Sequence, residues 1–113
     1  MPTTPDRYPD LPSLLEAIRK RPGMFLGHKT VYGLSVFLAG LAFAENYHNM
    51  PASDRLGGFD MEQFERWVEM KFNPSRLSLN SLSLAEHLAG SDESGFDLWF
   101  SWYDEFSGAT EQT

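Results

Sequence analysis

Three glutamates recur at helical spacing in the middle of the chain and are its best candidates for acid–base chemistry. Glu62, Glu65 and Glu69 lie three and four residues apart, which places their carboxylates on one face of a helix. Phe64 and Trp67 would then point to the opposite face. A paired general acid and base needs two such groups, but carboxylates opposite an apolar stripe are more typical of a solvated helix face. We therefore expect solvated charge here rather than catalysis.

The histidines, serines and glycines also fall outside the patterns of metal sites, nucleophiles and phosphate loops. His28, His48 and His87 share no metal-ligand spacing such as HExxH. No serine lies in a GxSxG turn, and neither GxxxxGK[ST] nor GxGxxG occurs. The sequence therefore predicts a protein that is not an enzyme and that holds no metal and no cofactor.

Charge is distributed unevenly along the 113 residues, which carry a net charge of −7. Residues 77–113 contain seven acids and no Lys or Arg, whereas residues 1–30 contain five basic groups against three acids. An acidic chain repels the phosphates of nucleic acids, while it attracts a basic protein and accelerates the encounter. We therefore expect a basic protein as the partner, and no nucleic acid.

The segment FDLWFSWYDEF, residues 96–106, combines acids with more aromatic area than one helix face can easily hide. An aromatic stripe at helical spacing is usually core, and acids often only solubilise a domain. Trp and Tyr are nevertheless favoured at interfaces. We predict a partner surface built from the acids and aromatic rings of this region: Asp92, Glu93, Asp97, Asp104 and Glu105, with Trp99, Trp102 and Tyr103 as anchors.

Five helical patterns would position these groups. The first begins at a capping box formed by Ser13 and Glu16 and stops before Pro22. The second begins at Thr30 and ends near residues 47–49, and because it is apolar almost all round we expect it at the centre of the fold.

The remaining three patterns follow residue 58. Asp60 caps the third helix, Phe59 packs on Phe64 as a hydrophobic staple, and Asn73-Pro74 ends it. The fourth runs from Ser83 to Gly90, and the fifth runs from Ser91 or Ser94 to a stop at Gly108.

Five helices with short connections predict a compact all-α bundle. The alternative is an α+β fold in which residues 24–26 pair with residues 77–79 as a minor two-stranded sheet. We expect an N-terminal arm over residues 1–10, a single domain over 11–108 and a C-terminal tail over 109–113.

The composition of the N-terminus and the absence of cysteine indicate in which cellular compartment the protein is expected. MPTTPDRYPDLP contains four prolines and no apolar core of a signal peptide, and no run of 18 apolar residues occurs. A chain without cysteine has no disulfide framework. We therefore expect a cytoplasmic protein that does not enter a membrane.

LEAIRKRPGMFLG, residues 15–27, resembles the LEAxRKRPGMYIG segment that leads into the ATPase domain of type II topoisomerases, the gyrase B-like members of the GHKL group. The resemblance covers about 13 residues. Glu45 and Asn46 are adjacent, where that family spaces its acidic base and magnesium-binding Asn by a helical turn, and a DxGxG motif is absent. We therefore expect no ATPase activity.

Over its whole length the chain resembles small bacterial proteins that combine RPGM[FY]LG with a helix of the GLSVFLAGL type, a mid-chain FxxWV and a closing acidic–aromatic helix. That resemblance implies a non-enzymatic, immunity-like role. Our first hypothesis is an immunity protein whose acidic surface masks the active site of a cognate toxin. The alternative is a small regulator that binds a topoisomerase or another ATPase through RKRPGMFLG, residues 19–27.

Overall fold

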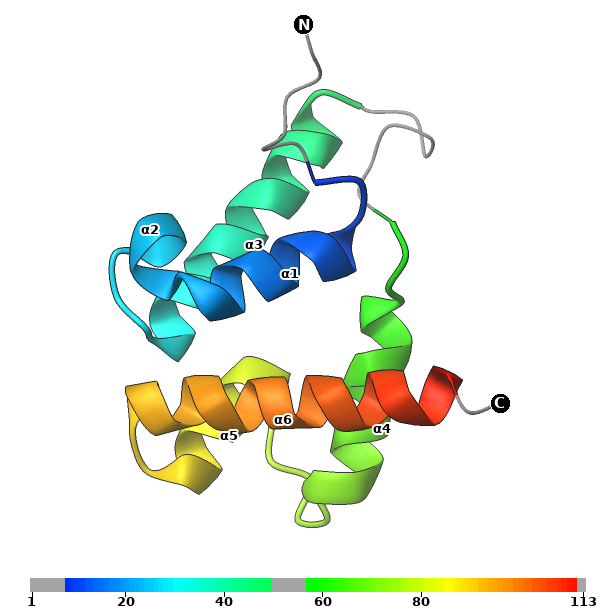
Figure 1. Cartoon of the computed structure of the whole chain (residues 1–113). Coiled ribbons are helices and arrows are strands. Elements are labelled where there is room, and N and C mark those ends of the chain that lie inside the picture. The colour runs from blue at the N-terminus through cyan, green and yellow to red at the C-terminus, as the bar shows by residue number, and fades with distance from the viewer. Residues whose placement is uncertain (1–7, 50–56, 112–113) are drawn as a thin grey trace, which may run out of the picture.

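The protein is all-α. A computed structural model describes residues 8–49 and 57–111, and within these ranges the chain forms six helices and no strand (Figure 1). Residues 24–26 belong to a short helix and residues 77–79 are irregular, so the minor sheet is not formed. The helices are α1 (Leu11–Lys20), α2 (Pro22–Leu26), α3 (Val31–Tyr47), α4 (Met61–Phe72), α5 (Ser81–Ala89) and α6 (Asp92–Glu111).

The C-terminal helix α6 lies at the centre of the core. It contributes five buried side chains, more than any other helix: Phe96, Trp99, Phe100, Trp102 and Tyr103. The other long helices pack against this row with Leu14, Leu15 and Ile18 from α1, Val31 and Leu34 from α3, Phe64 and Val68 from α4, and Leu84 and Ala85 from α5. α5 reverses into α6 at Gly90, whose φ of 88° is a left-handed conformation that glycine adopts without strain.

The expectation that the apolar helix α3 is central is wrong. Only Val31 and Leu34, in its first turn, are buried, while Phe43 and Tyr47 are 67% and 71% exposed. A helix of 17 residues is about 25 Å long, and α3 leads away from α5 and α6 towards its C-terminal end (Figure 1). The larger rings of α6 occupy the centre instead.

Local capping signals set most of the helix starts. Asp60 caps α4 by accepting the Gln63 N–H at 3.0 Å, as predicted, and the Phe59 and Phe64 rings pack 5.5 Å apart. α1 begins at Leu11 rather than at Ser13, because the Asp10 carboxylate accepts the Ser13 N–H at 2.9 Å. The hydrogen bonds from Ser13, side chain first and backbone second, hold the pKa of Asp10 below its usual value.

The starts of α5 and α6 and the end of α6 are further helix boundaries to compare with the prediction. Asn80, rather than Ser83, caps α5, and the Ser91 hydroxyl caps α6 by accepting the Ser94 N–H at 3.0 Å. α1 ends before Pro22 as predicted, but α6 continues through Gly108 to Glu111. Gly108 does not adopt a positive φ, so nothing stops the helix there. The predicted tail is therefore helical up to residue 111.

Two glycines of α6 provide a test of this packing. A methyl group at Gly95 would lie 2.8 Å from the Glu86 Cα and 2.9 Å from Val31 Cγ2, whereas one at Gly108 would meet open space. Gly95→Ala is expected to lower the free energy of unfolding by about 1–3 kcal/mol through overpacking. Gly108→Ala is expected to raise it by up to about 1 kcal/mol through helix propensity. Urea unfolding followed by circular dichroism measures both, and equal effects would contradict the close α5–α6 contact.

Candidate functional site

The exposed face of α6 is acidic. Glu93, Asp97, Ser101 and Asp104 recur at helical spacing, and all four are exposed, on the side of α6 away from the buried rings. The side chains of Asp97 and Asp104 are 65% and 58% exposed. Together with the neighbouring Glu105 they form what we call the acidic stripe: Glu93, Asp97, Asp104 and Glu105.

Two acids of the stripe form ion pairs with the N-terminal half of the chain. Lys29 Nζ lies 2.9 Å from Asp97 Oδ2, and Arg19 Nη2 lies 2.8 Å from Asp104 Oδ2. Both pairs line a groove of about 400 Å³ that also contains Phe100 and other apolar side chains. Exposed pairs of this kind contribute about 0–1 kcal/mol each. A basic group from outside could therefore replace Lys29 beside Asp97 at low cost.

Arg19 also makes contacts that a lysine would not. Its guanidinium lies 4.7 Å from the centre of the Phe100 ring and donates to the Phe100 carbonyl at 2.9 Å, in addition to its pair with Asp104. A planar guanidinium can stack and hydrogen-bond at the same time. Arg19 is thus committed to holding α1 against α6.

The other predicted acids have different surroundings. Glu105 pairs with Lys71 of α4, and Asp92 accepts the backbone N–H of Tyr32 at 3.1 Å, which ties the start of α6 to the first turn of α3. Glu93 has no ion-pair or hydrogen-bond partner within the described part of the chain. The predicted acids are therefore all on α6, but only Glu93 carries a charge that the fold does not already use.

The prediction that Trp99, Trp102 and Tyr103 anchor a partner is wrong, because all three are core residues with 0%, 3% and 7% exposure. Trp102 stacks on Phe72 with ring centres 4.7 Å apart, and Trp99 packs against Phe64 at 5.4 Å. Burial raises the pKa of the Tyr103 hydroxyl. At 100° per residue the buried side chains of α6 span about 160°, so surrounding helices cover both tryptophans although they point in different directions.

The RKRPGMFLG segment is partly buried and partly exposed. Lys20 and Arg21 are exposed, and Met24 is 64% exposed. The Phe25 ring is half-buried between Tyr8 and Phe37, with ring centres 6.1 and 6.2 Å away. The segment is thus an anchor through Phe25, and its exposed part consists of Lys20, Arg21 and Met24.

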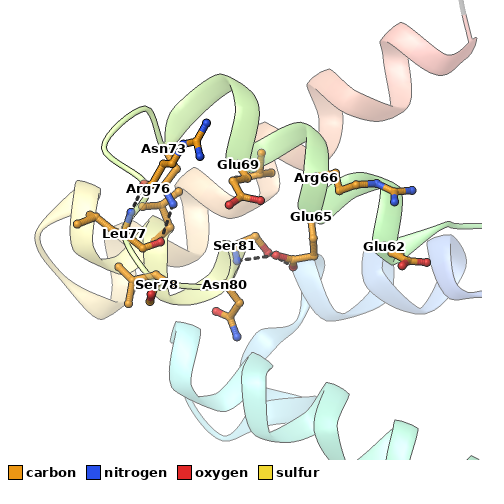
Figure 2. Close-up of a pocket in the computed structure, with 13 residues that line it drawn as sticks. Glu62, Glu65, Arg66, Glu69, Asn73, Arg76, Leu77, Ser78, Asn80 and Ser81 are labelled. Carbon is orange, nitrogen blue, oxygen red and sulfur yellow. Dashed lines mark hydrogen bonds between the residues drawn. The ribbon is translucent and has the colours of Figure 1, made fainter.

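A second hollow lies between α4 and the segment that follows it. Figure 2 shows this pocket of about 450 Å³, with Glu62, Glu69 and Arg66 on α4 and Arg76 on the opposite side. The Asn73 side chain closes the turn that follows α4. Its amide N–H donates to the Leu77 carbonyl, and its carbonyl oxygen accepts the Leu77 N–H, both at 2.9 Å. The pocket presents both signs of charge and is wide open, so it marks no single ligand.

Glu65 is not part of a solvated row, although Glu62 and Glu69 are exposed as predicted. Its carboxylate accepts the Ser81 N–H at 2.8 Å and the Ser81 hydroxyl at 2.5 Å (Figure 2). The buried Ser81 oxygen in turn accepts the Trp99 indole N–H at 2.8 Å. Sequence spacing does not reveal this network, because its members come from three helices. The only signal is that a buried tryptophan requires some acceptor.

Neither metal nor membrane features occur in the described part of the chain. No three His, Asp or Glu residues within 8–49 and 57–111 are placed to hold a metal ion, and the three histidines are exposed. The same ranges contain no helix that is long and apolar enough to cross a membrane.

The buried polar network gives a stability prediction. Ser81→Ala removes the acceptor of the Trp99 indole and one donor to Glu65, and an unsatisfied buried N–H costs about 1–3 kcal/mol. We expect a loss of about 2 kcal/mol in the free energy of unfolding from denaturant titration. Ser101→Ala, at an exposed position on α6, is the control and should change it by less than about 0.5 kcal/mol. Equal free energies of unfolding for the two variants would show that the Glu65–Ser81–Trp99 hydrogen bonds do not stabilise the fold.

No protein-family model, curated protein or solved structure matches this chain. The resemblances to gyrase B-type subunits and to small RPGM[FY]LG proteins therefore stay predictions.

Proposed function

We propose that this chain is a non-enzymatic binding protein, and specifically an immunity protein that neutralises a cognate bacterial toxin by covering its active site. The observation that carries the proposal is the acidic stripe, in which four carboxylates lie on the exposed face of a single helix. Toxin sites that handle nucleic acids or nucleotides are basic, so a row of acids is complementary to them.

The position of the stripe supports this role. The opposite face of α6 is the hydrophobic core, so the backbone that carries Asp97 and Asp104 is held in place. A preorganised surface loses little conformational freedom when it binds. Lys29, which pairs with Asp97, would give way to a basic group of the toxin, because exposed ion pairs are weak. Arg19 would stay in place, because it also contacts Phe100.

Charge reversal on the stripe is the test of this proposal. The partner is first identified as the protein that co-purifies stoichiometrically with the tagged chain from its own organism. Stopped-flow association with that protein is then measured over a salt series. Glu93→Lys and Asp97→Lys are expected to slow association about tenfold at low salt and to flatten its salt dependence, because steering is lost.

Two controls separate steering from overall charge. Glu62→Lys makes the same charge change at an exposed position on α4, away from the acidic stripe, and should slow association much less. Lys29→Gln removes the cation beside Asp97 and should leave association as fast or faster. If Glu62→Lys and Glu93→Lys slow association equally, only net charge matters, and unchanged rates in all variants would refute the acidic surface.

The exposure of Lys20, Arg21 and Met24 favours a second candidate function, a regulator that binds a topoisomerase subunit or another ATPase. In that case the co-purifying protein is such a subunit, and Arg21→Glu with Met24→Glu should abolish its capture. Glu93→Lys should leave the capture intact. The opposite result, loss with Glu93→Lys alone, would reject the regulator.

A further inference from the structure

α3 carries an exposed apolar stripe that the acidic surface does not use. Its members are Tyr32, Val36, Ala39, Gly40, Phe43 and Tyr47, which we call the α3 stripe, and all of them are exposed. At 100° per residue they fall within an arc of about 100°, so they form one continuous face. No charged residue occurs from Val31 to Ala44. Phe43 and Tyr47 are already stacked on each other with ring centres 5.6 Å apart.

The positions along this stripe are symmetric about its middle, and paired positions carry residues of similar kind: small, apolar and tyrosine. Around a midpoint between Ala39 and Gly40 the two small residues are followed outward by Val36 and Phe43, and then by Tyr32 and Tyr47. An interface with twofold symmetry requires such self-complementarity, because each residue meets its counterpart from the other end. An antiparallel pair of α3 helices would place Val36 against Phe43, and Tyr32 against Tyr47, twice.

Within the residues that the structure describes, nothing packed on Gly40 explains why it is glycine. A methyl group added there would meet nothing within 4 Å, so packing among these residues does not require glycine. Glycine in a helix interior costs about 1 kcal/mol relative to alanine. Small residues at a helix crossing allow two backbones to approach closely. Gly40 and Ala39 lie at the point where the axis of a symmetric pair would pass.

We propose that the α3 stripe binds the same stripe of a second copy in antiparallel orientation, making the protein a homodimer. The three rings are 73%, 67% and 71% exposed, and aromatic side chains bury about 150–250 Å² each. With Val36 and the small residues, the pair would bury on the order of 1,000 Å², the lower bound for a specific interface. The dimer is therefore weak, and it does not depend on the function proposed for the acidic stripe.

The absence of charge on the α3 stripe favours a second copy over a basic partner at this face. The stripe contributes no carboxylate, so it offers nothing to a basic protein, whereas an uncharged surface can meet itself without desolvating ions. Two copies of a chain with net charge −7 repel each other. Added salt screens that repulsion. The dimer is accordingly expected to strengthen with salt, opposite to an association steered by the acidic stripe.

Sedimentation velocity of the full chain tests the proposal, over a concentration range from about 1 to about 300 µM that suits a weak interface. The wild type is expected to shift from monomer to dimer, and the shift should occur at lower concentration in higher salt. Phe43→Glu is expected to remain monomeric throughout. Met70→Glu, which changes an 85% exposed side chain on α4 in the same way, should dimerise like the wild type.

Gly40→Leu separates dimer loss from unfolding. Leucine is the better helix former, so circular dichroism should show an equally or more stable monomer, while the dimer weakens at least tenfold. A wild type that stays monomeric at every concentration would overturn the proposal, even if another molecule binds the α3 stripe. A dimer that persists in Phe43→Glu would also overturn it, because another surface would then form the contact.

The register can be tested with disulfides, because the chain has no cysteine of its own. Val36→Cys and Phe43→Cys variants, mixed and oxidised, should form a disulfide-linked heterodimer. Each variant alone should crosslink poorly, since two copies of the same position lie about 10 Å apart along the antiparallel helices. Homodimers from each variant alone, without the heterodimer, would overturn the antiparallel arrangement.

Discussion

The wide aromatic face of α6 must be removed from water, and the positions of the other helices follow from this requirement. Phe96, Trp99 and Trp102 point in different directions around the helix, so no single neighbour can cover them. Phe64 and Phe72 of α4 pack on Trp99 and Trp102, while buried side chains of α5 and of the first turn of α3 complete the core around the row. Aromatic rings carry the largest apolar area per residue and therefore decide which helix becomes central.

Polar groups inside this arrangement are satisfied by partners from other helices. The Trp99 indole reaches Ser81 of α5, and Ser81 reaches Glu65 of α4, so a single chain of hydrogen bonds joins three helices. Arg19 similarly joins α1 to the backbone and a side chain of α6. Each bond contributes only about 1 kcal/mol. Their main effect is to select one relative placement of helices that apolar packing alone would leave less well defined.

The sequence predicts those features that depend on neighbours in the chain. Asp60 caps α4, Pro22 limits α1 and Gly90 ends α5 because the relevant contacts span only three or four residues. Hydropathy predicts a central α3 because it measures how apolar a helix is, but not which partner covers it. The bonding of Glu65 depends on residues far away in the sequence, so local spacing carries no trace of it. The spacing of the α6 rings indicates a core stripe, but it does not show that neighbours cover both tryptophans.

The division of α6 into a buried and an exposed side has a consequence for how such a protein can diversify. Asp97 and Asp104 contribute little to folding, because their pairs are exposed, whereas Trp99 can hardly be replaced. Under the proposed function, recognition and stability would thus reside on different positions of one helix. Successive substitutions on the outer side could alter which molecule is recognised while the inner side preserves the architecture, so lineages could exchange specificity without passing through unfolded intermediates.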